Sequence, residues 1–277
     1  MQPDSQARAR FEALLAEPVV PLDRAALAIA AEEYPGLDEA ACLDQLEVLA
    51  SQVRRRVAGP ARTAQVLAAV REVLFEEEGF RGNEKDYYDA RNSYLNQVLE
   101  RRLGIPITLS LLFIEVGRRV GLSLSGVAFP GHFLAKLQLG HGPEIFVDAY
   151  NGGELLTGEE VVARFKHLVH GREFDSRFLE AVAPRQLLAR MLHNLKRIYV
   201  EQGDDVRAYW VIDRLLLLHP DAMDEVRDRG LVEARLGLKP AAARDLEAYL
   251  AHAPQAPDSG DVRSLLETLR SHPTLLN

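Results

Sequence analysis

A histidine and an aspartate stand in two neighbouring segments in which apolar and polar residues alternate. His132 begins the segment 132–139, and Asp148 lies within the segment 145–150. This alternation predicts two strands, and His141-Gly142-Pro143 between them predicts a hairpin loop. An imidazole beside a carboxylate can act as a general base toward water or a hydroxyl group. The same pair can be a buried structural hydrogen bond between adjacent strands, so both interpretations stay open.

Few other residues offer the chemistry of a nucleophile or of a metal site. Cys42 is the only cysteine, so no disulfide can form within the chain. Its apolar, helical surroundings predict a small hydrophobe rather than a reactive thiol. His167 and His170 have a spacing compatible with a metal ion on one helix, but no third ligand follows in a recognisable pattern. We therefore predict no metal site and no cofactor.

The segments around the histidine and aspartate predict a buried helix and a small sheet. Residues 106–120 are apolar on nearly every side, which is typical of a helix at the centre of a domain. Pro106 suits the first position of that helix, where the missing N–H costs nothing. Three strands are expected after Gly121, at 122–129, 132–139 and 145–150, and Asn151-Gly152-Gly153 ends the sheet.

Further helices flank this central part. Prolines and glycines divide residues 5–78 into four short helices, with Asp38 placed to cap the third. A helix is expected at 88–103, ended by Gly104, and another at 158–167.

The C-terminal part of the chain repeats with a period of 34 residues. Proline and small or apolar residues recur at this offset, in the pairs Pro220 and Pro254, Gly203 and Gly237, Ala208 and Ala242, Ile212 and Leu246, and Leu216 and Leu250. Such a period, with small residues at helix crossings and proline at the end, is typical of tetratricopeptide repeats. We expect two units, at 189–222 and 223–256, followed by a helix at 261–271.

The order of these segments resembles one bacterial family over nearly the whole chain. Four stretches are similar to the SirB-type (YchA-like) family: FRGN at 80–83, NSYLNQVLERRLGIPITLSLLF at 92–113, PGHFL at 130–134 and DAYNGG at 148–153. In that family a transglutaminase-like core precedes tetratricopeptide repeats. The resemblance implies an α+β fold in three parts: a helical N-terminal region at 1–79, a papain-like, transglutaminase-like core with a small antiparallel sheet at 80–180, and α-helical repeats at 181–277.

The resemblance also implies what the core lacks. A transglutaminase-like core places a cysteine at the start of a buried helix, a histidine on one strand and an aspartate on the next. His132 and Asp148 match the last two positions, which makes them a vestigial or an alternative dyad. Arg118 and Gly121 match the end of the helix, and counting back from them places Pro106 where the cysteine would stand. The nucleophile position therefore holds no nucleophile.

Three polar residues near this position are candidates for a pocket: Asn92, Thr108 and Ser110. Thr108 and Ser110 could offer a substitute hydroxyl, although side chains in the first turns of a helix often bond the backbone instead. Asn92 could line a polar pocket, or it could cap a helix or anchor a loop.

Composition and charge limit the class of partner. The formal net charge of -8 argues against general binding to nucleic acid, because phosphate contacts need a basic surface. The sequence has no apolar run of about 18 residues, so we expect no membrane span. Its first residues form no apolar stretch of signal-peptide length. Together with the single cysteine, these features favour the cytoplasm.

Two classes of function follow from these features. The first is a non-enzymatic, regulatory interaction module, a pseudoenzyme whose core groove and repeats hold a protein or peptide partner. The second is a hydrolase or acyl-transfer enzyme that uses His132 and Asp148 with an activated water or hydroxyl. Loss of the nucleophile removes the main advantage of a covalent mechanism. The proline at position 106 therefore favours the interaction module over an enzyme.

Overall fold

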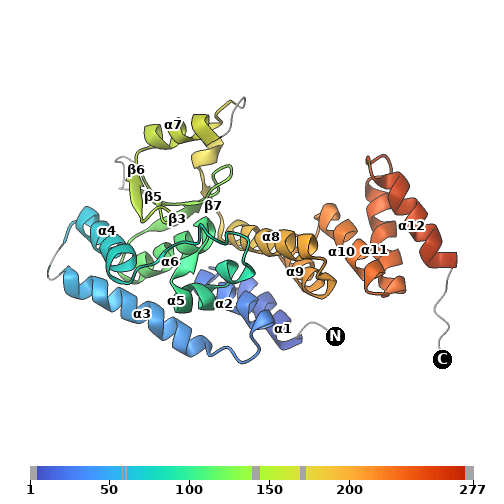
Figure 1. The fold of residues 1–277 in the computed structure, drawn as a ribbon, viewed down its shortest axis with the longest axis horizontal. Helices are drawn as coiled ribbons and strands as arrows, with labels where there is room; N and C mark the ends of the chain where they lie inside the picture. Colours follow the sequence, from blue (N-terminus) through green and yellow to red (C-terminus); the bar gives the residue numbers. More distant parts are fainter. Residues whose placement is uncertain (1–4, 58, 60, 139–143, 169–172, 272–277) are drawn as a thin grey trace. The chain divides into compact units, whose positions relative to one another are not determined.

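The computed structural model describes the chain except for residues 1–4, 58, 60, 139–143, 169–172 and 272–277. The contacts divide the chain into two compact units, one ending at Met191 and the other beginning at Leu192. The first combines helices with a five-stranded sheet, and the described residues of the second are helical (Figure 1). The predicted α+β class is therefore confirmed. The predicted boundaries near residues 79 and 180 stay predictions.

The N-terminal helices form where prolines and glycines divide the sequence. They are α1 (Ser5–Leu15), α2 (Leu22–Glu33), α3 (Glu39–Arg56) and α4 (Thr63–Arg71), the last continued by a π-helical turn at Glu72–Glu77. The Asp38 carboxylate accepts a hydrogen bond from the Ala41 N–H at 3.0 Å, so the predicted cap of α3 is confirmed. These helices make a layer around α6 (Pro106–Arg119), which α2, α3 and α4 contact.

The helix α6 is the centre of the first unit. Every residue from Pro106 to Gly117 is buried, as the apolar sequence predicts. Proline at its first position leaves no N–H unsatisfied there. Because α6 is covered by helices and also contacts β3 and β4, it links the helical layer to the sheet.

The helix predicted at 88–103 is shorter than expected. The chain forms a 3-10 turn at Ala90–Ser93 and then α5 (Leu95–Arg101), with Tyr94 extended between them. The carboxylate of Asp89 accepts a hydrogen bond from the Arg91 N–H and starts the short turn. The helix ends at Arg101, because the next residue, Arg102, has φ 60°, and it does not continue to Gly104. Leu103–Gly104 (β2) instead pairs in parallel with Arg81–Gly82 (β1).

The sheet of the first unit has the strand order β6-β5-β4-β3-β7, with antiparallel neighbours throughout. The three predicted strands are confirmed as β3 (Leu124–Val127), β4 (Leu134–Gln138) and β5 (Glu144–Asp148). Two short strands were not predicted, β6 (Glu154–Leu156) and β7 (Ala181–Val182). The register sets Ala135 opposite Val147. The predicted hairpin loop at 141–143 lies outside the described residues.

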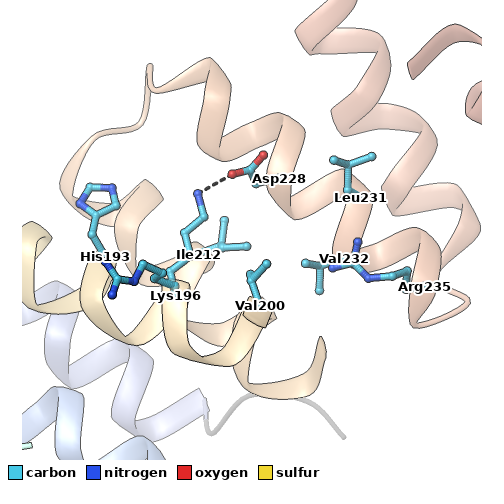
Figure 2. A pocket seen from close by; sticks show the side chains of 9 residues that line it. His193, Lys196, Val200, Ile212, Asp228, Leu231, Val232 and Arg235 are labelled. Carbon is cyan, nitrogen blue, oxygen red and sulfur yellow. Dashed lines mark hydrogen bonds and ion pairs between the residues drawn. The ribbon is translucent and has the colours of Figure 1, made fainter. Parts of the chain in front are cut away.

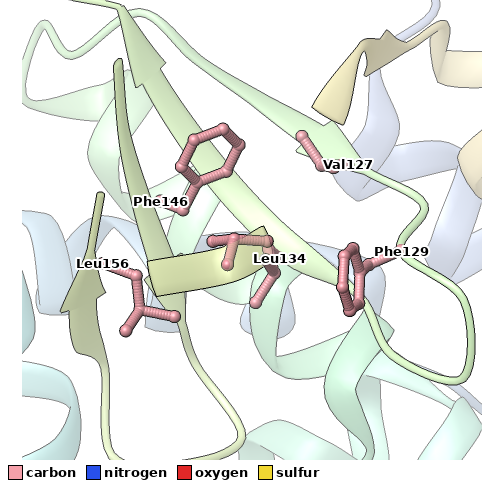
Figure 3. Close-up of a cluster of buried hydrophobic side chains, with 6 residues drawn as sticks. Val127, Phe129, Leu134, Phe146 and Leu156 are labelled. Atoms are coloured by element: carbon pink, nitrogen blue, oxygen red, sulfur yellow. The ribbon is translucent and has the colours of Figure 1, made fainter. Parts of the chain in front are cut away.

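A cluster of buried apolar side chains fills the space beside one face of the sheet, and Figure 3 shows five of its members labelled. Phe146 and Leu134 come from adjacent strands, and Val161 comes from α7 (Gly158–Leu168). Phe174, Phe178 and Leu179 pack against the cluster. The sheet is thus held by apolar contacts, and the ends of β4 and β5 are fixed in register.

The second unit contains paired helices at the predicted repeat positions. They are α9 (Asp205–Leu218), α10 (Met223–Arg235), α11 (Lys239–His252) and α12 (Ser259–Ser271), preceded by α8 (Pro184–Gln202), whose first residues belong to the first unit. A Cβ on Gly230 would lie 2.9 Å from the Leu246 side chain, so glycine lets α10 and α11 pack closely. Within the described parts of the chain, no helix is both long and apolar enough to cross a membrane.

Candidate functional site

His132 and Asp148 meet where β4 begins and β5 ends. The two strands are antiparallel neighbours, so His132, two residues before β4, lies beside Asp148, the last residue of β5. The distance from His132 Nε2 to Asp148 Oδ1 is 2.8 Å. The His132 N–H also donates to the Phe129 carbonyl across a turn that contains Gly131 at φ 73°. The structure thus brings the two residues into contact.

The Asp148 carboxylate is buried and accepts hydrogen bonds from three residues. Besides His132, the donors are the N–H and side-chain amide of Asn151, at 3.2 and 2.9 Å, and Arg164 at 3.1 Å. Burial by itself would raise the pKa of Asp148, but the hydrogen bonds and charge of His132, with the bonds from Asn151, lower it below the ordinary value of 3.8. Asp148 therefore stays ionised and orients the imidazole.

The turn after β5 places the two Asn151 donors beside the Asp148 carboxylate. Gly152 and Gly153 have φ angles of 68° and 72°, which favour glycine. A Cβ on Gly153 would also lie 2.5 Å from the Phe75 ring. The Gly153 N–H donates to the Asp148 carbonyl at 2.9 Å, which folds Asn151 back onto the carboxylate.

Tyrosine rings lie beside the imidazole. The Tyr150 ring meets the His132 ring edge to face at 6.1 Å between centroids, and Tyr87 lies 6.2 Å from Tyr150. A Cβ on Gly82 would lie only 2.5 Å from the Tyr150 ring, so the glycine leaves room for it. The His132 side chain is 17% exposed and contacts Asp148 through Nε2, so Nδ1 is the ring nitrogen that does not contact the carboxylate.

The start of α6 contains hydroxyls that are already engaged. Pro106 is the first residue of the helix and is buried. The Thr108 hydroxyl accepts from the Ile105 N–H at 3.1 Å and donates to the Asn92 carbonyl at 2.7 Å. It therefore caps the helix and ties it to the preceding turn.

Ser110 and Asn92 are likewise fully buried and hydrogen-bonded. The Ser110 hydroxyl donates to the Phe133 carbonyl at 3.3 Å, one residue from His132. The Asn92 amide donates to the Asp86 carbonyl at 2.7 Å, and its oxygen accepts from Asn83 at 3.0 Å. These bonds fix the loop and the strand around the site. The pocket role of Asn92, Thr108 and Ser110 stays a prediction, to which these contacts lend no support.

The structure adds three residues to the site that the sequence did not single out as functional. Asn151 and Tyr150 stand in the DAYNGG stretch, so their nearness to Asp148 in the chain was an available signal. Arg164 follows Asp148 by 16 residues, in α7, and also pairs with Glu154 at 2.5 Å. No sequence pattern linked Arg164 to the histidine and aspartate.

A second candidate site is a groove of about 270 Å³ between α8 and α10, wholly within the second unit (Figure 2). Its apolar floor consists of Val200 from α8, Ile212 from α9, and Leu231 and Val232 from α10. Ile212 and Val232 are buried, whereas Val200 leaves 47% of its surface exposed. The groove therefore presents apolar surface that no described residue covers.

Charged side chains surround this floor. Lys196 Nζ lies 2.7 Å from Glu225 and also pairs with Asp228. Arg235 pairs with Asp205 at 2.7 Å, and Arg197 pairs with Glu201 at 3.4 Å. The pairs of Lys196 thus join α8 to α10, Arg235 is tied to α9, and Arg197 pairs within α8. Together these charged groups frame the apolar surface.

Cys42 belongs to neither site; it lies in α3 and is half-buried. Burial raises the pKa of its thiol, and the carboxylates of Asp38 and Glu39 raise it further. Among the described residues, no group of three or more His, Cys, Asp or Glu side chains is arranged to hold a metal ion. The side chains of the predicted pair His167 and His170 lie outside the described residues.

Comparison with known proteins agrees with this arrangement. Residues 40–193 match the transglutaminase-like superfamily, and residues 195–267 match the tetratricopeptide repeat. A UPF0162 protein of Xylella fastidiosa is 41% identical over 258 residues, which cover 90% of each chain. A UPF0162 protein of Vibrio cholerae is 30% identical over 67% of this chain and 68% of its own length.

A eukaryotic relative is similar over a smaller share of the chain. F-box only protein 21 of the mouse is 35% identical over 62% of this chain, which corresponds to 28% of that protein. No solved structure matches significantly. The matched ranges include the histidine–aspartate pair and the repeat groove, and the similarity to the bacterial proteins runs along most of the chain. The chain belongs to the UPF0162 proteins, bacterial members of the transglutaminase-like superfamily in which tetratricopeptide repeats follow the core.

Proposed function

We propose that this chain is a protein- or peptide-interaction module with a regulatory role, and that its transglutaminase-like core is a pseudoenzyme. The groove between α8 and α10 carries the proposal, because it combines uncovered apolar surface with a charged rim. Tetratricopeptide repeats generally mediate binding between proteins. A core without a nucleophile fits this role better than a role in covalent catalysis.

The start of α6 supports the pseudoenzyme part of the proposal. Pro106 has no group that can attack a carbonyl, and it is buried at the first position of the helix. The hydroxyls of Thr108 and Ser110 are fully buried and donate to backbone carbonyls. Neither hydroxyl is available to replace a thiol without breaking a structural hydrogen bond.

Site-specific cross-linking in bacterial cells tests the binding role. A benzophenone amino acid replaces Val200 in the groove, and the same replacement at Val48 in α3 is the control. Both valines are about equally exposed, at 47% and 56%. We expect discrete protein adducts from position 200 that position 48 does not give. The same adducts from both positions, or none from position 200, would contradict the proposal.

A hydrolase or acyl-transfer enzyme is the second candidate. It is favoured by the 2.8 Å bond from His132 Nε2 to Asp148, which leaves Nδ1 of a partly exposed ring for a proton transfer to or from water. Its test is turnover of activated esters and of amine donors by the full chain. Turnover that disappears in His132→Ala would support the enzyme, whereas equal background rates would support the pseudoenzyme.

A further inference from the structure

Three basic side chains at the edge of the groove between α8 and α10 are about half exposed. Arg197 from α8 is 53% exposed, and His193 and Arg235 are similarly exposed. The carboxylates that pair with the groove's cations differ in exposure: Glu225 is 10% exposed beside Lys196, whereas Glu201 is 60% exposed beside Arg197. The lining itself holds three cations, Lys196, Arg197 and Arg235, and one carboxylate, Asp228. The charge of the lining is therefore positive, although the whole chain has a net charge of -8.

The ion pairs at the rim can exchange partners at low cost. Arg197 reaches Glu201 one turn away at 3.4 Å, and both side chains are more than half exposed. Surface pairs of this kind contribute little to stability, because water screens both charges. Arg235 contacts Asp205 with its Nε at 2.7 Å, and its guanidinium has further N–H groups for a second carboxylate. A partner's carboxylate can thus join or replace these pairs without leaving a buried charge unpaired.

Apolar and basic groups alternate over a short distance. Val200 stands one turn after Lys196 and Arg197 on α8, and Leu231 stands one turn before Arg235 on α10 (Figure 2). A volume of about 270 Å³ accommodates one or two aliphatic side chains, but not a folded element. The groove therefore fits a short segment that inserts one or two aliphatic side chains.

We propose that this groove binds a peptide segment in which aliphatic residues are flanked by aspartate or glutamate. The inference rests on the proposed interaction function and adds the chemistry of the partner. The aliphatic side chain covers Val200 and Leu231, and the flanking carboxylates bind Arg197 and Arg235. Charge complementarity sets the orientation and the choice of partner, while burial of the apolar surface supplies affinity.

Fluorescence polarisation with the full-length chain tests this ligand class. The probe is a labelled twelve-residue peptide with two central leucines, two glutamates on either side, and Gly-Ser ends. A second peptide replaces the glutamates by lysines, and a third replaces the leucines by glycines. We expect the acidic, leucine-containing peptide to bind about tenfold tighter than either of the others, and its affinity to fall as salt is raised.

Matched variants locate the binding site. Arg197→Glu reverses one rim charge and should weaken binding of the acidic peptide about tenfold. Val200→Ser should weaken it several-fold, because it removes apolar surface from the floor. Arg270→Glu in α12 changes a side chain that is equally exposed but lies outside the groove, and it should leave binding unchanged.

The outcomes separate this inference from the proposed function. Equal binding of the three peptides, or tighter binding of the lysine peptide, overturns the ligand class. So does weakening by Arg270→Glu to the same extent as by Arg197→Glu. If such a result comes with discrete adducts at position 200 in cells, the interaction module survives with a different partner chemistry. If the adducts are also absent, both proposals fail.

Discussion

Two buried carboxyl groups, one in each unit, have pKa values shifted in opposite directions. Asp148 in the first unit accepts hydrogen bonds from His132, Asn151 and Arg164, and its pKa lies below the ordinary value. Glu233 on α10 in the second unit is 4% exposed, and its Oε2 is buried with no hydrogen-bond partner among the described residues. Burial, with Asp245 nearby, raises the pKa of Glu233 to about 7.

The neighbours of Glu233 explain the difference. Asp245 on α11 and Asp213 on α9 are further carboxylates, and they raise its pKa in addition to burial. Arg229 and Arg244 lower it, but Arg229 already donates to Asp245 at 3.1 Å. Burial penalises the charged form at both sites. The hydrogen-bond donors around Asp148 favour its ionised form, whereas the lack of a donor at Glu233 Oε2 within the described part of the chain favours the protonated form.

The largest effect is expected from Asp148→Ala. This substitution leaves Arg164 and His132 without their shared buried acceptor, so the free energy of unfolding should fall by about 3 kcal/mol. Urea unfolding followed by circular dichroism measures the change. Glu154→Ala also removes a partner of Arg164, but a half-exposed one, and should cost far less. Equal losses in the two variants would show that Asp148 does not organise the site.

The acid side of the pH profile provides a second check on Asp148. Because its pKa is lower in the folded chain than the ordinary 3.8, its stabilising contribution is present above pH 3.8 and is lost as the pH falls through the folded-state value. Asp148→Asn should therefore flatten the loss of stability at acid pH. An unchanged acid profile would contradict the assigned hydrogen bonds.

The next largest effect is expected from Glu233→Gln. The pKa of Glu233 is raised in the folded chain, so its contribution is present in full below pH 4.5 and is lost as the pH rises through about 7. The glutamine variant should gain about 2 kcal/mol over the parent at pH 8 and little at pH 5. Urea midpoints at the two pH values measure this difference.

A matched control separates burial from the loss of a negative charge. Glu247→Gln on α11 removes a half-exposed carboxylate that pairs with Arg270. It should leave the difference between pH 5 and pH 8 unchanged. If Glu247→Gln stabilises the chain at pH 8 as much as Glu233→Gln does, the effect comes from net charge and not from the buried carboxyl.

The sequence predicted the elements that rely on local periodicity. The continuous apolar pattern of α6 and the alternation in β3, β4 and β5 were sufficient for these elements. The strands β6 and β7 contain three and two residues, too few to show a period. The break in the helix at Tyr94 depends on hydrogen bonds that Asp89 and Asn92 make with the loop, and the apolar pattern does not record such bonds.

For the site residues, too, the sequence predicted what depends on local pattern and missed what depends on tertiary packing. His132 and Asp148 could be paired because each belongs to a predicted strand, whereas Arg164 reaches Asp148 only through the packing of α7. Glu233 did carry a signal. At the repeat offset of 34 residues it corresponds to Tyr199, which is buried. A carboxylate at a position where the other repeat buries an aromatic ring indicates a desolvated acid.

The smallest effect is expected at Cys42, which extends the comparison to a thiol. Burial first, and then the carboxylates of Asp38 and Glu39, raise its pKa above 9.0, so the thiolate fraction at pH 8 is small. Iodoacetamide should therefore alkylate the folded chain several-fold more slowly than it alkylates free cysteine. Asp38→Asn removes one charge but keeps an N-cap acceptor, and should speed the reaction slightly by lowering the pKa. Rapid alkylation at low pH would mean that a donor or cation stabilises the thiolate, and Cys42 would then resemble Asp148 rather than Glu233.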